Sequence, residues 1–256
     1  MKGGGGAGVG KNNVGTGAGV GHAPRGYGRR SRLGTAAGAQ DCASVDHTDV
    51  ILVIGANPTD GHPVFGSRMK KRLRAGAKLI VADPRKIDLV KSPHILADFH
   101  LPLKPGTNVA FINAMSHVIV TEGLVNEEFV KERCDTYDFQ SWARFVAEER
   151  HSPEAQADII GVDPEQLRVA ARPSLPHGNT SRIFFRLALT VHPHSSTLAM
   201  ALSHISLATR HLSRLPLVAH PLSSHHPPHA SRATRHLQMP GPAARRPTAG
   251  RVTSYH

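Results

Sequence analysis

Residues 49–54 are Asp49-Val-Ile-Leu-Val-Ile54, an unbroken apolar run after a single acidic residue. Such a run is typical of a strand that is buried on both faces of a parallel sheet. It is followed by the turn Gly55-Ala-Asn-Pro-Thr-Asp60, by a basic amphipathic segment over Phe65–Ala75 and by a second apolar run, Lys78-Leu-Ile-Val-Ala82. A strand, a helix and a strand within roughly 35 residues predict a right-handed crossover. We therefore expect an α/β fold with a Rossmann-like, doubly wound parallel sheet, in which these two strands are adjacent.

The pattern continues downstream as one globular unit over residues 45–172. Ile95–Leu101 is expected to be a third, shorter strand, and Pro105-Gly-Thr-Asn108 introduces a helix that runs to about Glu122. Asp163-Pro164-Glu165 is a good helix start, because it combines a capping residue, a proline at the first helical position and an early acid. Further helices are expected over Asn126–Cys134, Phe139–Glu149 and Asp163–Ala171.

Both ends of the chain differ in composition from this central unit. Residues 1–44 are rich in Gly and poor in apolar periodicity, so we expect a poorly ordered arm. Residues 173–256 are rich in Pro, Ser, His and Arg and contain no Asp, Glu or Lys, so we expect that this tail does not fold by itself and that residues 215–256 lack a packed core. Residues 1–172 hold all 19 acidic residues and 22 of the 31 Lys and Arg residues, whereas the tail holds nine Arg. The net charge of +12 therefore belongs mostly to the tail.

These features bear on the partners and the location of the protein. A non-enzymatic basic protein that binds nucleic acid through its tail stays an alternative, although the tail lacks Lys and interleaved aromatic residues, so no specific nucleic-acid site is expected. The apolar runs are too short to span a bilayer, and no signal-peptide pattern is visible. Cys42 and Cys134 do not have metal-site spacing. A reducing, cytoplasmic location is the expectation.

Two glycine-rich motifs near the start of the chain are weak nucleotide signals. Gly5–Lys11 resembles a phosphate loop, but Asn12 stands where the Ser or Thr that holds Mg²⁺ is needed. Gly15–Gly21 has the spacing GxGxGxG instead of GxGxxG, and no predicted strand precedes either motif.

Polar residues that follow the two predicted strands are stronger candidates for a binding site. Asn57, Asp60 and His62 come just after the first strand, and Asp83 and Arg85 come just after the second. In open α/β sheets, ligands bind outside the carboxyl ends of the strands. A carboxylate there can bind ribose hydroxyls or a guanine edge, and an arginine with nearby backbone N–H groups can bind phosphates. The alternative is that the Asn-Pro and Asp-Pro pairs simply form turns.

Four longer motifs resemble the catalytic subunit of molybdenum-dependent formate dehydrogenases, in the molybdopterin oxidoreductase family. They are Thr48-Asp-Val-Ile-Leu-Val-Ile-Gly-Ala-Asn-Pro-Thr-Asp-Gly-His-Pro63, Gly76-Ala-Lys-Leu-Ile-Val-Ala-Asp-Pro-Arg-Lys86, Leu103-Lys-Pro-Gly-Thr-Asn108 and His117-Val-Ile-Val-Thr-Glu-Gly-Leu-Val-Asn-Glu-Glu-Phe129. The resemblance implies that residues 45–172 bind one half of a bis-molybdopterin guanine dinucleotide cofactor that carries molybdenum. The cofactor-binding residues that it implies are Gly55, Asn57, Asp60, Gly61 and His62 in the first turn, Asp83, Pro84 and Arg85 in the second, and Gly106 and Asn108 in the third.

Upstream, Asn12-Asn-Val-Gly-Thr-Gly-Ala-Gly-Val-Gly-His22 resembles the active-site segment of the same family without gaps. The family has a Cys or selenocysteine ligand to molybdenum where this chain has Gly21, and the neighbouring proton acceptor of the family corresponds to His22. Molybdenum needs a soft thiolate or selenolate at this position, and glycine has no side chain. No metal-ligating residue is therefore expected in this chain.

The tail resembles a degraded continuation of the family. Arg186-Leu-Ala-Leu-Thr-Val-His-Pro-His-Ser-Ser-Thr197 and Thr209-Arg-His-Leu-Ser-Arg214 keep its register but lose most of its Gly, Glu, Gln and Asn residues. The resemblance further implies that the chain is a fragment, with the iron–sulfur cluster expected only in a missing N-terminal part.

The activity that the resemblance implies is oxidation of formate to carbon dioxide. The electrons would pass through electron-transfer subunits to an acceptor such as NAD, and His22 would take up the proton. Because of Gly21, we expect the polypeptide as written to be inactive. Another molybdopterin oxidoreductase, such as a nitrate reductase, is the alternative within the family.

Overall fold

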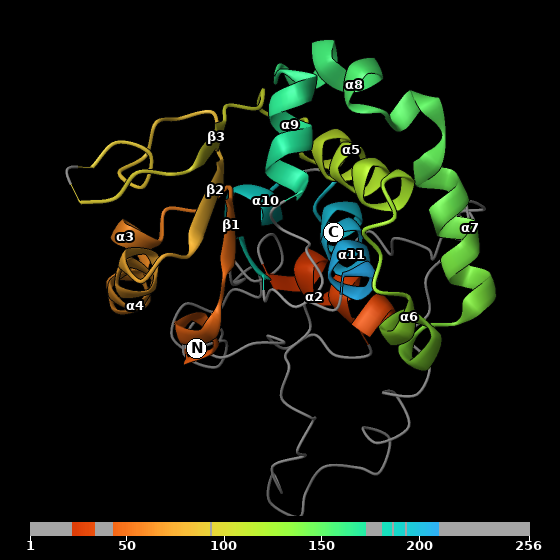
Figure 1. The fold of residues 1–256 in the computed structure, drawn as a ribbon, viewed down its shortest axis with the longest axis horizontal. Helices are drawn as coiled ribbons and strands as arrows, with labels where there is room; N and C mark the ends of the chain where they lie inside the picture. Colours follow the sequence, from red (N-terminus) through yellow and green to blue (C-terminus); the bar gives the residue numbers. More distant parts are fainter. Residues whose placement is uncertain are drawn as a thin grey trace, which may run out of the picture.

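The computed structural model describes residues 22–33, 43–92, 94–172, 181–185, 187–192 and 194–209. Its centre is a sheet of four parallel strands: β1 (Val50–Ile54), β2 (Lys78–Ala82), β3 (Phe99–Leu101) and β4 (Ser181–Phe185), in the order β3-β2-β1-β4 (Figure 1). The first two strands pair along their whole length, from Val50 opposite Lys78 to Ile54 opposite Ala82. The predicted α/β fold with adjacent parallel strands is confirmed. No described helix is long and apolar enough to cross a membrane.

Both faces of the sheet are buried, which explains why its strands are continuously apolar. On one face, Ile51 and Val53 pack with Met69 of α4 (Pro63–Arg74), the helix predicted between the two strands. On the other face, Leu52 and Ile54 join a larger core formed with α5 (Asn108–Thr121), α9 (Pro164–Ala171) and α11 (Ser195–Ala208). Figure 1 shows α4 to one side of the strands and these three helices to the other.

The remaining described elements are short and mostly helical. They are α2 (His22–Leu33), η2 (Ala43–His47), α3 (Pro58–Gly61), α6 (Glu127–Arg133), α7 (Thr136–Ala147), η3 (Glu149–His151), α8 (Pro153–Ile160) and α10 (Leu187–Thr190). Side-chain caps fix four helix starts, because an acceptor before the helix takes a free backbone N–H of its first turn. The capping residues are Asn126, Asp135, Ser152 and Asp163. The predicted start at Asp163-Pro164 is confirmed.

The third strand is shorter than predicted. Residues 95–101 were expected to be extended, but the paired strand is Phe99–Leu101, and Ile95 instead forms an isolated antiparallel bridge with Ser92. The backbone N–H of Leu79 donates to Asp98, 2.7 Å away, so a side chain takes the bond that a longer strand would have supplied. Local hydrogen bonding therefore ends the strand early.

Parts of both terminal segments are folded, which corrects the expectation that residues 1–44 lack a packed core. The same expectation for residues 215–256 is not tested, because they lie outside the described residues. Within residues 1–44, α2 packs against α11; within residues 173–256, β4 extends the sheet beside β1, and α11 is buried along most of its length. Long-range contacts provide this order, because α2 and β4 lack the local patterns that predict structure. Residues 1–21, 34–42 and 210–256 lie outside the described residues, so the expectation for them stays a prediction.

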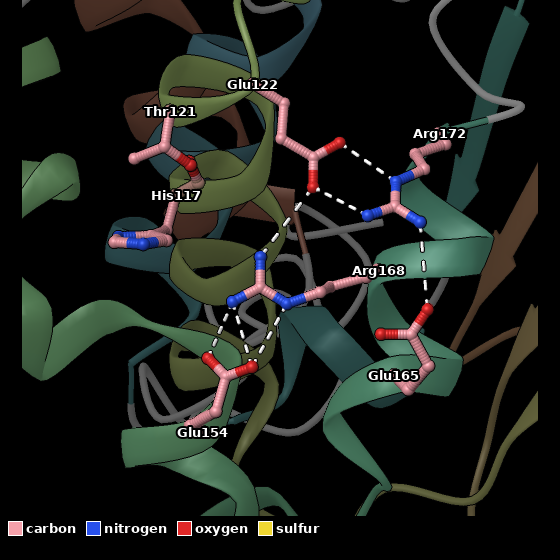
Figure 2. A network of polar contacts seen from close by, with 7 residues as sticks. All are labelled: His117, Thr121, Glu122, Glu154, Glu165, Arg168 and Arg172. Carbon is pink, nitrogen blue, oxygen red and sulfur yellow. Dashed lines mark hydrogen bonds and ion pairs between the residues drawn. The ribbon is translucent and has the colours of Figure 1, made fainter.

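An ion-pair network connects three helices on the outer surface (Figure 2). Arg168 on α9 contacts Glu154 on α8 at 2.7 Å and Glu122 at the end of α5 at 3.7 Å. Arg172 pairs with the same Glu122 at 2.9 Å and approaches Glu165 at 3.7 Å. The hydrogen bond from Arg172 lowers the pKa of Glu122, and the bond from Arg168 lowers that of Glu154. The network thus holds α5, α8 and α9 together from the solvent side.

Candidate functional site

The residues that the sequence proposes for binding follow the carboxyl ends of three neighbouring strands. Ile54 and Ala82 end β1 and β2 opposite one another, and the backbone N–H of Gly55 donates to the carbonyl of Ala82 at 3.2 Å. Leu101 ends β3 beside Ala82 and leads into the third turn. Because all the strands are parallel, the three turns lie at one edge of the sheet, which we call the carboxyl edge.

The first turn presents a carboxylate that is held by its neighbours. The amide nitrogen of Asn57 donates to Asp60 Oδ2 at 2.6 Å, and the carbonyl oxygen of the same amide accepts from the hydroxyl of Thr59. The single helical turn α3 is closed by a bond from the N–H of Gly61 to the carbonyl of Asn57, at 3.0 Å. Asp60 and the following His62 are exposed. The turn therefore fixes the position of Asp60 and leaves it accessible.

The second turn holds an arginine against a buried carboxylate. The side chain of Asp83 is only 3% exposed, and its Oδ1 accepts from the backbone N–H of Arg85 at 2.9 Å and from Arg85 Nε at 3.2 Å. The Arg85 side chain is 71% exposed, so most of its guanidinium faces solvent. The hydrogen bond that Arg85 donates to Asp83 raises the pKa of Arg85, and the charge of Asp60 raises it further. The first two turns thus share one electrostatic environment.

His100 on β3 is a residue of this edge that the sequence did not single out. Its Nε2 lies 3.0 Å from the backbone carbonyl oxygen of Asp83. This contact joins the end of β2 to β3 and fixes the backbone that carries the buried carboxylate. The available signal was its position within the predicted third strand, which says nothing about a specific partner.

The third turn approaches a segment from the far end of the chain. A side chain at Gly106 would point toward His192, whose Nε2 lies 3.5 Å from the place that a Cβ would take. Asn108 begins α5, and the residue before it, Thr107, donates its hydroxyl to the carbonyl of Lys104 at 2.7 Å instead of capping the helix. The first backbone N–H groups of α5 are thus not capped by Thr107.

At Gly55 the structure provides a packing reason for glycine. Its φ is +55°, and a Cβ there would lie 2.0 Å from Cδ1 of Leu189, a buried residue of α10. Leu189 follows β4, so it covers the point between β1 and β4 where the order of the strands reverses. Open α/β sheets usually bind ligands at such a point. Since Leu189 fills it here, the accessible part of the carboxyl edge is the β1–β2 side, with Asp60 and Arg85.

The structure does not test the residues that were expected at the metal end. Gly21 lies outside the described residues. His22 is the first residue of α2, and only its backbone is described. Among the described ranges, no group of three or more His, Cys, Asp or Glu side chains is arranged to hold a metal ion. Glycine itself offers no donor atom to a soft metal.

A cavity of about 310 Å³ lies at the opposite edge of the sheet. It is lined by residues that precede β2 and β3, including Gly76, Ala77 and Asp98. It therefore does not belong to the site at the carboxyl edge.

The donor set at the carboxyl edge is suited to the nucleotide end of a dinucleotide cofactor and not to its metal end. Arg85 offers free guanidinium N–H groups to phosphate oxygens, and Asp60 offers carboxylate oxygens to hydroxyl or base N–H groups. The described residues contain no soft-metal ligand set.

Comparisons with known proteins identify the family of the chain. A family model described as molybdopterin oxidoreductase matches residues 7–236. Formate dehydrogenase H of Escherichia coli is 34% identical over 206 residues, which are 80% of this chain and 28% of that protein. A nitrate reductase of Symbiobacterium thermophilum is 30% identical over 173 residues, 64% of this chain and 22% of that protein.

Among solved structures, acetylene hydratase from Pelobacter acetylenicus matches with a TM-score of 0.63 and 26% identity, covering 73% of this chain and 24% of that one. The chain thus spans less than a third of the length of each of these three proteins.

Proposed function

Since the chain belongs to the molybdopterin oxidoreductase family, whose cofactor is a molybdopterin that carries molybdenum, we propose that its carboxyl edge binds the guanine dinucleotide end of that cofactor. The observation that carries the proposal is Arg85, an exposed guanidinium held by the buried carboxylate of Asp83 at the end of β2. Because Asp83 restrains the arginine in the absence of a ligand, less conformational entropy is lost when phosphate binds.

Each residue of the edge has a distinct role in this proposal. Arg85 binds a phosphate oxygen through the guanidinium nitrogens that Asp83 does not use. Asp60, oriented by Asn57, accepts hydrogen bonds from ribose hydroxyls or from the N–H groups of the guanine edge. Gly61, His62, Pro84, Gly106 and Asn108 complete the proposed set as the residues of the three turns.

We further propose formate as the substrate of the enzyme type from which this chain derives, because a formate dehydrogenase matches most of the chain. When bound, the molybdenum cofactor supplies a two-electron acceptor, which formate oxidation to carbon dioxide requires. His22 is the proposed acceptor of the proton that formate releases. Electron-transfer subunits and an acceptor such as NAD belong to the same proposal.

Nitrate reduction is the second candidate, because a nitrate reductase also matches 64% of the chain. In either case Gly21 supplies no protein ligand to the metal. We therefore propose that the chain with Gly21 does not turn over formate or nitrate.

Nucleotide binding by the full-length chain tests the proposed site. We expect guanosine diphosphate to bind weakly and Arg85→Gln to weaken that binding at least about tenfold, since a lost charge-assisted hydrogen bond costs roughly 1.5–3 kcal/mol. Arg74→Gln is the matched control, because Arg74 is an exposed arginine of α4 at the opposite edge and lines the cavity there. Equal losses of guanosine diphosphate affinity in the two variants, or no binding of this nucleotide by the parent chain, would contradict the proposal that the carboxyl edge binds the nucleotide.

A chimera tests the cofactor itself. Residues 45–172 are transferred into an intact formate dehydrogenase in place of its corresponding segment, and molybdenum content and formate oxidation are measured. We expect the chimera to load the cofactor and to oxidise formate, because the transferred block keeps the turn residues. A chimera that folds without binding molybdenum cofactor would show that the assignment is wrong.

A further inference from the structure

Two helices from opposite ends of the chain cross in close contact, away from the carboxyl edge. They are α2 and α11, and Figure 1 shows α2 below α11. The crossing depends on Gly28: a Cβ there would lie 2.6 Å from the backbone oxygen of Ser196 and 2.8 Å from Cβ of Ala199. This close approach brings the arginines of α2 to the face of α11 that carries His204.

Three buried nitrogen atoms at this crossing have no hydrogen-bond partner in the described part of the chain. They are Nε of Arg29, Nε of Arg32 and Nε2 of His204. His204 is only 7% exposed, and its ring lies 5.6 Å from that of Trp142. Buried polar atoms in native proteins almost always have a partner, so three orphans in one region call for an acceptor.

Arg32 has only weak hydrogen-bond acceptors in this region. Its Nη2 donates to the sulfur of Met200 at 3.2 Å, and its Nη1 reaches the carbonyl oxygen of Ser31 only at 3.5 Å. A thioether sulfur is a weak acceptor, and the second contact is at the limit of a hydrogen bond. The guanidinium therefore has no strong acceptor among the described residues.

The charges around the crossing are almost all positive. Neither α2 nor α11 contains an acidic residue. Burial and the charge of Arg25 lower the pKa of Arg29, and burial lowers that of Arg32 although Asp138 on α7 opposes the shift. Burial also lowers the pKa of His204 to about 3, so its ring is neutral near pH 7. A neutral ring with its proton on Nε2 is a hydrogen-bond donor that adds no charge.

We propose that Arg29, Arg32 and His204 form a binding site for a small oxyanion, with inorganic phosphate as its simplest representative. Arg29 and Arg32 are one turn apart on the same side of α2, and His204 adds a donor from α11. A phosphate has enough acceptor oxygens for the Nε–H groups of the two arginines and for Nε2 of His204 in the tautomer that the proposal assigns to it, with the proton on Nε2. The charge of the phosphate compensates two half-buried cations. The site is independent of the proposed cofactor edge, which lies at the ends of β1 and β2.

Trp142 provides a local signal for a test, because it is the single tryptophan of the chain and its ring faces His204. Tryptophan fluorescence of the full-length chain is followed as inorganic phosphate replaces chloride at constant ionic strength. We expect a saturable change in fluorescence and a rise in the temperature of unfolding that chloride does not produce.

Three variants of the same chain decide where the phosphate binds. Arg32→Met should weaken phosphate binding at least about tenfold, since it removes a charge-assisted donor. Arg30→Met should leave the binding unchanged, because Arg30 is an exposed arginine of the same helix. Arg85→Gln should also leave it unchanged, which separates this site from the cofactor edge.

Stability in the absence of phosphate gives a second readout. If the site is as proposed, Arg32→Met unfolds at the same or a higher temperature than the parent in chloride, and phosphate no longer raises that temperature. No phosphate-specific signal in the parent, or the same loss of signal in Arg30→Met, overturns the proposal. A signal that disappears only in Arg85→Gln assigns the phosphate to the carboxyl edge and also overturns it.

Discussion

Gly55→Ala tests the finding that Leu189 fills the point where the strand order of the sheet reverses. The substitution has two costs that the structure separates. A residue with a side chain at φ +55° is in the left-handed region, which costs about 1–2 kcal/mol. The new Cβ would also lie 2.0 Å from Cδ1 of Leu189, so the buried leucine has to move, and overpacking of this kind costs about 1–3 kcal/mol. We expect a total loss of about 2–5 kcal/mol in the free energy of unfolding.

A second substitution isolates the contact. In a chain that carries Leu189→Ala, most of the steric part of the cost disappears, because the remaining neighbour, Cβ of Ala188, lies 3.2 Å from the new Cβ; Gly55→Ala should then cost about 1–2 kcal/mol. The coupling energy between the two positions should therefore be about 1–3 kcal/mol, larger than the few tenths expected of independent sites. Gly123→Ala is the matched control, because Gly123 has a similar φ of +68° and no heavy atom near its Cβ position.

Urea unfolding followed by circular dichroism measures all of these variants on the same scale. We expect Gly55→Ala to lower the free energy of unfolding more than Gly123→Ala does. Additive effects of Gly55→Ala and Leu189→Ala would refute it, since they would mean that the two residues do not touch in solution. An equal cost at positions 55 and 123 would show that backbone conformation alone explains the glycine.

Three further predictions concern the helical surface and the buried thiol. Arg168→Met should lower the free energy of unfolding by no more than about 1 kcal/mol, because the ion pairs of Arg168 are partly exposed; a loss above about 2 kcal/mol in urea titrations would show a stronger network. The pKa values of Glu122 and Glu154 are lowered in the fold, so the network's contribution to the free energy of unfolding is complete above the ordinary carboxyl pKa of 4.5 and is lost as the pH falls below it. Arg168→Met should therefore make the free energy of unfolding less dependent on pH in that range. Burial raises the pKa of the Cys134 thiol to about 11, so in a Cys42→Ser background it should react with iodoacetamide at pH 8 only after unfolding, and fast labelling of the native chain would contradict its burial.

The sequence predicted the central part of the fold because its signals there are local. Two apolar runs of strand length flank an amphipathic helix, and burial on both faces explains why β1 and β2 have no polar alternation. The helix Pro164–Ala171 was predicted from its capping residue, whose carboxylate accepts from the backbone N–H of Gln166 at 3.0 Å. Patterns of this kind act through neighbouring residues, so they do not depend on the rest of the chain.

The elements that were missed are stabilised by distant partners. Ser181–Phe185 lies in a segment whose composition suggested that it would not fold by itself, and it becomes a strand by pairing with β1. Helix α2 contains two glycines in 12 residues, which disfavour a helix, and the same Gly28 that weakens it in isolation permits its contact with α11. Helix α8, Pro153–Ile160, was missed although Ser152 caps it, because its apolar spacing is weak.

The candidate site likewise contains residues that the local sequence predicted and residues that distant contacts bring to it. Asp60, Asp83 and Arg85 were predicted from their positions after strands, and the structure places them at one edge, while Leu189 and His192 reach that edge only through the pairing of β4. In the proposed division, the nucleotide end would depend on backbone turns and charges within residues 45–172, whereas the metal end would depend on a donor atom that Gly21 does not have. Since the two ends use different residues, loss of the metal ligand does not require loss of nucleotide affinity. A chain that binds guanosine diphosphate through Arg85 but shows no turnover is therefore the outcome that the proposed division predicts.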